Sequence, residues 1–340
     1  MSMIRLSMLS AMALLLAASA AFAQPFRGEA IPISTDKKGV GFDDLRYSAA
    51  LHRVLVPAGR MGDLVLIDPA THQRTVITGL SSEEKYGGGH GEGTTSVDEG
   101  EGALYAIDRT SKEVVIIDPA ARRVTARAKL GGNPDYVRYL APTRELWVTE
   151  PDSDRIEIFN ISTKRDALAS VASIAVPGGP ESLVIDAAGG RAFTHLWTGT
   201  SIGLDLRSRT ITAKWPNRCD GSRGIAYDEH SHFLFAGCAE GKAVVMDAAH
   251  GGAVLATASA GNGVDIIDYD PVRRHLYLPG GRRATMTIFS VAANGALAPL
   301  VTTPIVRGAH CVTTDGNDAY VCDPDGGRIL VIHDSYPAAK

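Results

Sequence analysis

The chain has 340 residues, with 34 basic and 38 acidic side chains, for a net charge of −4. Phosphate binding needs a cationic surface, so this balance argues against nucleic acid as a partner. The 36 glycines and 17 prolines indicate many turns, as in a soluble all-β protein, and no segment after the N-terminal one approaches the length of a membrane span.

Residues 1–23 are predicted to be a secretory signal peptide. Arg5 precedes a short apolar run through Leu14–Leu16, and the segment ends on Ala21-Phe22-Ala23. The apolar run is too short to cross a bilayer and a small-residue cleavage site follows it directly; the alternative is an uncleaved anchor. Cleavage before Gln24 would leave residues 24–340, which we expect to form a single domain in the periplasm or outside the cell, with a net charge of −5.

Residues 222–258 contain the pattern that organises the rest of the chain. Four short apolar runs, at 224–228, 233–236, 243–246 and 253–258, are separated by polar or glycine-containing turns. Such a pattern predicts four short strands in one antiparallel sheet. A sheet of this size cannot bury both faces alone, so it needs similar sheets beside it.

The same unit recurs along the chain. The polar residues that end each third strand are spaced 42 to 50 residues apart: Asp68, Asp118, Asn160, Asp205, Asp247, Ser290 and Asp334. Seven such units predict a seven-bladed β-propeller with four antiparallel strands per blade. The last unit has only three strands, so we expect residues 28–34 to supply its fourth strand and close the ring; the alternative is a loose N-terminal arm.

The four cysteines of an exported chain favour disulfides over thiols. A turn centred on residues 315–318 places Cys311 opposite Cys322, and Cys219 and Cys238 both fall on loops at one end of the fifth blade. We therefore expect the pairs 219–238 and 311–322, although a cross-strand bridge demands specific geometry. The alternative is buried, unpaired thiols.

Several motifs resemble the YVTN-repeat propellers of exported bacterial proteins, the YncE-like group. They are Trp147–Glu150 (WVTE), Tyr320–Asp323 (YVCD), Gly132–Pro134 (GNP) and Gly178–Pro180 (GGP). The resemblance covers essentially all of residues 24–340 and implies the architecture. It implies no single activity, because that family and its relatives include ligand-binding proteins, subunits of redox complexes and, more distantly, metal-dependent lactonases. The lactonase metal ligands are Glu, Asn and Asp on the axis, and this chain has no clear Asn at the equivalent positions.

The start of each inner strand is expected to face the mouth of the central channel, where loops from all blades converge. Counting back from the second strands places there Asp43, Gly93, Asp135, Glu181, Arg223, Asp265 and His310. These residues predict a polar, net negative mouth suited to a cation or a hydroxylated small ligand. The count depends on the repeat register, since a slip of one residue reverses every side chain. The alternative is polar strand starts that merely line a water-filled channel.

An insertion and three histidines add to this mouth. The spacing between the first two repeat units, from Asp68 to Asp118, is 50 residues because it includes the Gly-rich segment 79–93. This segment is either a lid over the mouth or a tolerated surface loop. His90, His195 and His310 map to the mouth side. His90 and His195 with Glu181 would ligate a divalent metal, Zn²⁺ for a mixed set or Ca²⁺ for oxygens alone, although no compact ligand motif is present.

Two functional hypotheses follow. The first is an exported binding protein whose mouth recognises a small polar ligand or a periplasmic protein partner. The second is a metal-assisted hydrolase or lyase of lactonase type. There the hairpin that pairs the last two cysteines would set His310 opposite Asp323 as a general base, with Arg223 as electrostatic stabiliser. A cross-strand His and Asp is also an ordinary structural pair.

Overall fold

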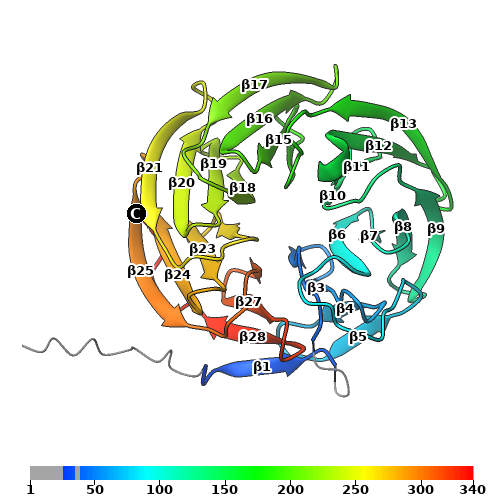
Figure 1. Cartoon of the computed structure of the whole chain (residues 1–340), viewed down its shortest axis with the longest axis horizontal. Helices are drawn as coiled ribbons and strands as arrows, with labels where there is room; N and C mark the ends of the chain where they lie inside the picture. Colours follow the sequence, from blue (N-terminus) through cyan, green and yellow to red (C-terminus); the bar gives the residue numbers. More distant parts are fainter. Residues whose placement is uncertain (1–25, 35–38, 340) are drawn as a thin grey trace, which may run out of the picture.

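The computed structural model describes residues 26–34 and 39–339, so the predicted signal peptide lies outside the described residues. Their strands form seven four-stranded antiparallel sheets, arranged as blades around a central channel (Figure 1). The predicted seven-bladed β-propeller is thus confirmed. Among the described residues, no helix has the length and apolar character needed to span a membrane.

Each blade runs from an inner strand beside the channel to an outer strand at the edge of the ring. In that order, the first three blades are β2 (Arg46–Ser48), β3 (Arg53–Pro57), β4 (Leu64–Ile67), β5 (Arg74–Ile77); β6 (Thr94–Gly100), β7 (Ala103–Asp108), β8 (Glu113–Asp118), β9 (Arg123–Lys129); and β10 (Val137–Leu140), β11 (Glu145–Glu150), β12 (Arg155–Ile161), β13 (Leu168–Ala175). A 3₁₀ turn, η1 (Pro151–Ser153), joins β11 to β12.

The remaining four blades follow in chain order. They are β14 (Val184–Asp186), β15 (Arg191–Leu196), β16 (Thr200–Asp205), β17 (Thr210–Pro216); β18 (Ser222–Asp228), β19 (Phe233–Cys238), β20 (Lys242–Asp247), β21 (Ala253–Ser259); β22 (Asp268–Asp270), β23 (His275–Gly280), β24 (Thr285–Val291), β25 (Leu297–Pro304); and β26 (Val312–Thr314), β27 (Asp318–Asp323), β28 (Arg328–His333), β1 (Glu29–Pro32).

The second and third strands of each blade form the core. β7 is buried along its whole length, whereas the outermost strand β17 alternates between exposed and half-buried residues. Middle strands are apolar on both faces because each face packs on a neighbouring blade, while an outer strand has one face in water. The residue at the centre of each second strand is almost fully buried in all seven blades: Leu55, Tyr105, Trp147, Phe193, Phe235, Tyr277 and Tyr320.

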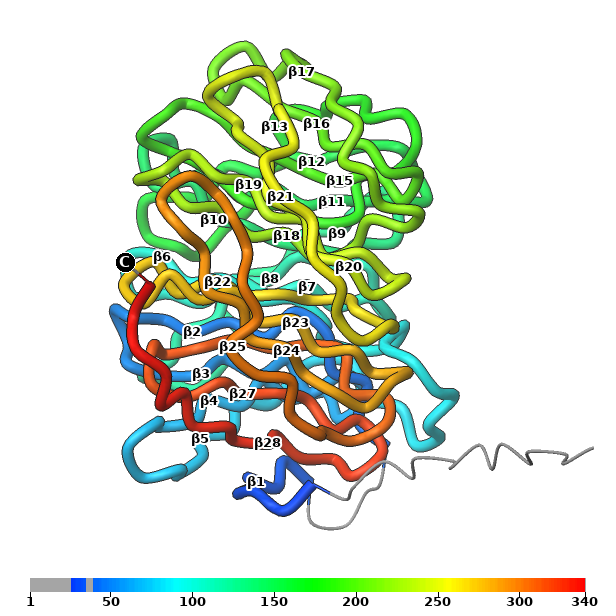
Figure 2. The backbone as a smooth tube through the Cα atoms, turned by 90° about the vertical axis from the view of Figure 1, so that its left-hand side faces the viewer, coloured from blue at the N-terminus to red at the C-terminus, as the bar shows by residue number. Residues whose placement is uncertain are grey.

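The N-terminal strand closes the seventh blade, as predicted. β1 pairs with β28 in antiparallel register from Glu29↔Val331 to Pro32↔Arg328, and the two strands lie side by side at the edge of the ring (Figure 2). Ile31 and Ile33 are only 3% and 8% exposed. The strand therefore contributes core side chains as well as backbone hydrogen bonds.

Both predicted cysteine pairs are joined as disulfides. Cys219 bonds to Cys238 and Cys311 to Cys322, with Cα–Cα distances of 5.3 and 5.5 Å, inside the range that a disulfide requires. The first bridge joins the loop before β18 to the end of β19, and the second joins the residue before β26 to β27.

His195 lies inside the fourth blade and not at the mouth, which corrects its predicted place. The side chain is fully buried in β15; Ser201 Oγ lies 3.0 Å from Nδ1, and the Phe235 carbonyl oxygen lies 3.3 Å from Nε2. Burial lowers the pKa of His195 to about 4, so the ring is neutral at pH 7. The misplacement arose because a residue late in a second strand can face either a neighbouring blade or the channel.

Deleting Arg27–Ser34 should destabilise the protein strongly, because it removes two buried side chains and exposes the edge of β28. The loss of several kcal/mol should lower the melting temperature by roughly 10 °C in thermal unfolding followed by circular dichroism. Glu29→Gln is the control, since it removes only the surface contact between Glu29 and His72 and should leave the melting temperature nearly unchanged. Equal melting temperatures for the deletion and the wild type would contradict closure by this strand.

His195 should make stability depend on pH in acid. Its pKa is about 4 in the folded protein and about 6.5 when unfolded, so its contribution is present above pH 6.5 and is lost as the pH falls toward 4. By pH 5 the loss should be about 2 kcal/mol of unfolding free energy. Urea unfolding should show that the free energy of unfolding falls less between pH 7 and pH 5 in His195→Gln than in the wild type. The same pH difference in both proteins would refute this assignment.

Candidate functional site

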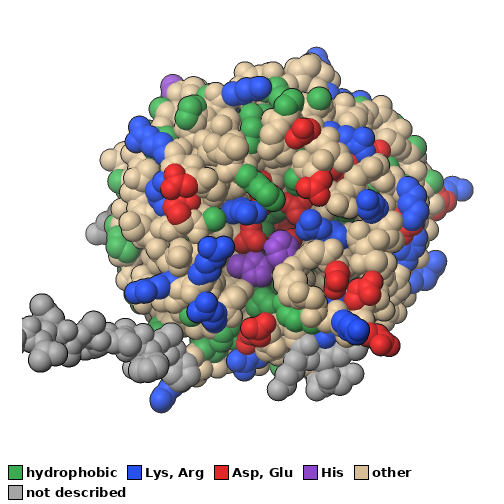
Figure 3. Space-filling model, in the orientation of Figure 1, with side chains coloured by type: hydrophobic (Ala, Val, Ile, Leu, Met, Phe, Trp, Pro, Cys, Tyr) green, Lys and Arg blue, Asp and Glu red, His purple; other side chains and the backbone are tan. Residues whose placement is uncertain are grey.

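The residues that precede the inner strands meet at one end of the channel, its mouth. Figure 3 shows this face hollowed at its centre, with histidine and acidic side chains there and basic side chains around them. The mouth is defined by six charged or polar side chains of the predicted ring: Asp43, Asp135, Glu181, Arg223, Asp265 and His310. His90 contacts Asp43 and Asp265, and Arg109 contacts Asp43 and Asp135. Arg223 and Glu181 form a separate ion pair, and the His310 ring lies beside that of His90.

The seventh ring position, Gly93, contributes backbone only. It has a φ of +68°, and a Cβ at this position would lie 1.9 Å from the carbonyl oxygen of Gly59. Its own carbonyl oxygen accepts a hydrogen bond from the backbone N–H of Arg109, at 2.7 Å. A glycine is therefore required for the insertion to rejoin the ring next to Arg109.

His90 lies between two carboxylates at the centre of the mouth. Its Nδ1 is 2.7 Å from Oδ2 of Asp43, and its Nε2 is 3.4 Å from Oδ2 of Asp265. The His310 ring lies beside it, with 5.2 Å between the ring centroids. One ligand atom from each of Asp43, His90, Asp265 and His310 lies within 4.8 Å of the others. These four residues are called the central cluster.

The charges of the central cluster depend on one another. The negative charge of Asp43 raises the pKa of His90 well above its usual value, although burial opposes this. Burial alone would raise the pKa of Asp265, but the hydrogen bond from His90 and the nearby positive charges lower it to about 2. Without a bound cation, the cluster therefore holds an imidazolium between two carboxylates.

Two further carboxylates lie on the other side of the mouth, and each contacts an arginine. Arg109 Nη1 donates to Asp135 Oδ1 at 3.0 Å, and Arg223 Nη1 donates to Glu181 Oε1 at 2.7 Å. Burial and then the charge of Asp265 raise the pKa of Glu181 to about 7. Burial and then the charge of Glu181 raise the pKa of Asp135 well above its usual value. Acidic groups crowd this space closely enough to favour protonation of some of them.

Part of the insertion 79–93 reaches the mouth, where Tyr86 and Gly88–His90 line the cavity, while most of the segment is exposed. The buried Arg60 fixes it: Nε donates to the carbonyl of Gly39 at 2.6 Å, and Nη1 donates to the carbonyls of Glu83 and Glu84 at 3.0 and 2.9 Å. Held in this way, the segment brings His90 to the central cluster.

A cavity of about 580 Å³ opens above the central cluster. His90, Asp265 and His310 line it together with three arginines, Arg223, Arg282 and Arg307. Arg282 and Arg307 are exposed, and within the described part of the chain neither forms an ion pair. Asp325 lines the cavity as well, so the rim carries these two arginines against one aspartate and keeps a net positive charge.

A larger cavity, of about 930 Å³, occupies the opposite end of the channel. Its principal charges are paired within the protein: Arg138 donates from both terminal nitrogens to Asp44, at 2.7 and 3.0 Å. Asp268 accepts hydrogen bonds from the Thr313 hydroxyl and the Thr314 backbone, at 2.8 and 2.9 Å. Asp270 also lines this cavity, and its Oδ2 has no hydrogen-bond partner among the described residues. The mouth is the stronger candidate site because it brings two imidazoles and two carboxylates within 4.8 Å of one another.

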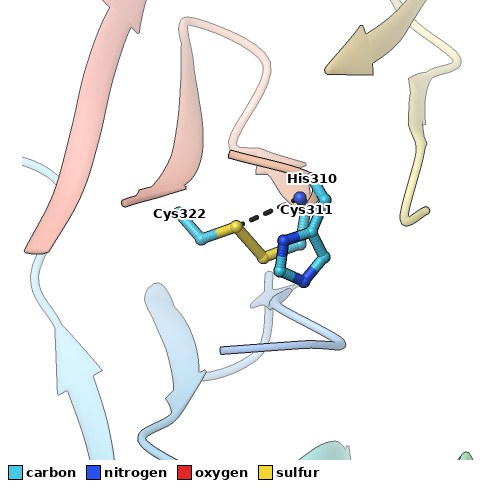
Figure 4. Close-up of side chains that lie close together, drawn as sticks. All are labelled: His310, Cys311 and Cys322. Atoms are coloured by element: carbon cyan, nitrogen blue, oxygen red, sulfur yellow. Dashed lines mark hydrogen bonds between the residues drawn. A yellow bond between two sulfur atoms is a disulfide. The ribbon is translucent and has the colours of Figure 1, made fainter. Parts of the chain in front are cut away.

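The predicted pair of His310 and Asp323 is not formed as a side-chain contact. The hairpin has the expected register, with Val312 opposite Val321, but β26 begins only at Val312. Asp323 instead accepts from the Gly326 backbone at 2.9 Å and from Arg328 Nε at 2.6 Å. Figure 4 shows His310 beside the disulfide that ends this hairpin. Beyond the bridge the two chains separate, so positions opposite in sequence no longer share an environment.

The predicted metal-ligand set of His90, His195 and Glu181 is not brought together either. Glu181 pairs with Arg223 and His195 is inside its blade, whereas His90 joins three members of the ring. Counting from inner strands also missed Arg109 and Trp197, which follow second strands. The loops after the second strands converge on the same mouth. Counting the residues that directly follow each second strand would therefore have placed Arg109 and Trp197 there. Arg223 lies over the Trp197 ring, 4.3 Å from its centroid.

No protein-family model matches the chain, and no curated protein matches it by sequence. Among solved structures, it is similar to a chain of the hydrazine synthase of Kuenenia stuttgartiensis, with a TM-score of 0.71 and 14% identity over 89% of this chain and 97% of that one. It is also similar to a chain of a mitotic checkpoint complex, with a TM-score of 0.70 and 15% identity over 98% and 99% of the two chains. At this level of identity, the comparisons show a shared β-propeller fold.

Proposed function

We propose that this protein is an exported binding protein that holds a small anionic ligand, such as a carboxylate, at the mouth. The observation that carries the proposal is the cavity above the central cluster, where Arg282 and Arg307 stand without ion-pair partners among the described residues. Guanidinium groups bind carboxylates and other oxyanions through paired, charge-assisted hydrogen bonds.

The charge balance supports an anionic ligand over a cationic one. His90, Arg109 and Arg223 lie beside the four carboxylates beneath the cavity, and the raised pKa values of Asp135 and Glu181 reduce the negative charge of that group. Arg282 and Arg307 then leave positive charge at the rim, which Asp325 offsets only in part. The sequence predicted a net negative mouth because only the seven ring positions were counted, and Arg282 and Arg307 are not among them. A concave cavity of this size suits a small molecule better than a protein surface.

Export is supported by the predicted signal peptide, the YVTN-like motifs and the two disulfides. The alternative of a lactonase-type hydrolase or lyase relied on His310 held by Asp323. These side chains contact other groups, so we favour binding over catalysis.

The proposal predicts that small carboxylates stabilise the protein and that the rim arginines are responsible. Acetate, succinate and citrate would be tested by thermal shift and calorimetry at low salt, with neutral sugars for comparison. Arg282→Gln with Arg307→Gln should weaken carboxylate binding at least tenfold, since each lost charge-assisted hydrogen bond is worth about 1.5–3 kcal/mol.

The matched control is Arg122→Gln with Arg123→Gln, which removes the same charge from exposed positions on the second blade. It should leave the affinity within about twofold. If no carboxylate binds, or if both double variants lose affinity equally, the mouth is not an anion site.

A further inference from the structure

We propose that Asp43, His90, Asp265 and His310 form a binding site for one Zn²⁺-like divalent metal ion. The four residues come from distant parts of the chain: the segments before β2, β22 and β26, and the insertion 79–93. The site lies at the floor of the cavity described above.

The first observation is a pair of polar atoms that lack hydrogen bonds. Asp43 Oδ2 and His90 Nδ1 are both buried, and neither has a hydrogen-bond partner among the described residues. They lie 2.7 Å apart, but the contact does not have the direction of a hydrogen bond. Asp43 is only 2% exposed, so without a metal its carboxylate depends on the charges of His90 and Arg109, at 2.7 and 3.9 Å, and not on water. A cation shared by both atoms would satisfy them together.

The second observation is the environment of His310. Its Nδ1 is 2.7 Å from the Gly308 carbonyl oxygen and its Nε2 is 3.2 Å from the Phe42 carbonyl oxygen. A neutral imidazole has one N–H, so it can donate to only one of these acceptors. A metal-bound histidine commonly donates its second ring N–H to a backbone carbonyl, as His310 can do to Gly308. That arrangement leaves the Nε2 lone pair for a cation.

The donor set selects the kind of metal. Two imidazole nitrogens and two carboxylate oxygens suit Zn²⁺ in four-coordinate geometry, whereas Ca²⁺ prefers oxygen ligands alone. Zinc bonds of about 2.0–2.1 Å set tetrahedral ligand atoms roughly 3.4 Å apart. The ligand atoms of the central cluster lie within 4.8 Å of one another, so the cluster must contract slightly. His90 can supply that movement because glycines at 87–89 and 91 surround it.

A metal at this position would fasten the insertion to the ring. His90 is the one ligand from the insertion, while Asp43, Asp265 and His310 precede inner strands of the first, sixth and seventh blades. The two carboxylates would balance the charge of the ion. The ion would also attract an anion in the cavity above it. This attraction matters only if the proposed function is correct, whereas the metal site does not depend on the proposed function.

The test uses the mature chain freed of metal with a chelator and then titrated with zinc chloride in a calorimeter. We expect one ion per chain, and a rise in melting temperature on zinc addition. His90→Gln and Asp43→Asn should each weaken zinc binding at least tenfold. With Co²⁺ in place of Zn²⁺, the wild type should show the intense visible absorption of a four-coordinate site. This measurement reports on the metal site in the wild-type protein, so it does not depend on any variant folding correctly.

The matched controls are His250→Gln and His333→Gln. Each of these exposed histidines also places Nδ1 2.9 Å from a carboxylate, that of Asp247 or Asp318. Among the described residues, neither belongs to a group of three or more side chains that could hold a metal ion. They should bind zinc like the wild type. Absence of stoichiometric zinc binding, or equal affinity in His90→Gln and His250→Gln, would overturn the site.

The metal site and the anion site can fail separately. If the metal-free chain binds carboxylates but does not bind zinc stoichiometrically, the proposed function is supported and the metal site is refuted. The opposite result is zinc binding that His90→Gln weakens, with no carboxylate binding to either the metal-free or the zinc-bound chain. It would establish the metal site and remove the anion proposal.

Discussion

Burial of the middle strands between neighbouring blades is the constraint on which the structure depends. A strand such as β7 has no face that tolerates water, so each blade requires a neighbour on both sides. Only a closed ring provides this for all seven blades, and the pairing of β1 with β28 completes the last of them. The channel and its mouth are consequences of that closure, since they exist only where seven inner strands face a common axis.

Closure also concentrates charge. Segments separated by more than two hundred residues, such as those of Asp43 and Asp265, contact the same His90 ring. The buried carboxylates cannot all remain ionised without cations beside them, and the protein supplies Arg109, Arg223 and His90. The Cys311–Cys322 bridge fixes the chain immediately after His310. The mouth is therefore held by covalent and electrostatic contacts together.

The repeat pattern predicted the architecture because blade packing imposes the same apolar spacing seven times. It also placed Asp43 and Asp265 at the mouth, although both lie in the segments before the inner strands β2 and β22 and not at their first residues. It could not place His195, because a second strand contacts both a neighbouring blade and the channel end. It also could not pair His90 with Asp43, since the insertion has no counterpart in the other blades and is positioned by hydrogen bonds from Arg60 to backbone carbonyls. Side-chain partners in loops depend on such local geometry, which periodicity does not encode.

The position of β1 has a consequence for the order in which the molecule is assembled. The strand is synthesised before every other strand of the ring, but its partner β28, Arg328–His333, is synthesised after all of them. Earlier blades can pack as they emerge, whereas the ring stays open until β28 has been synthesised. A chain that is threaded unfolded through a membrane, N-terminus first, would meet the same delay on the far side, because β1 would emerge there long before β28.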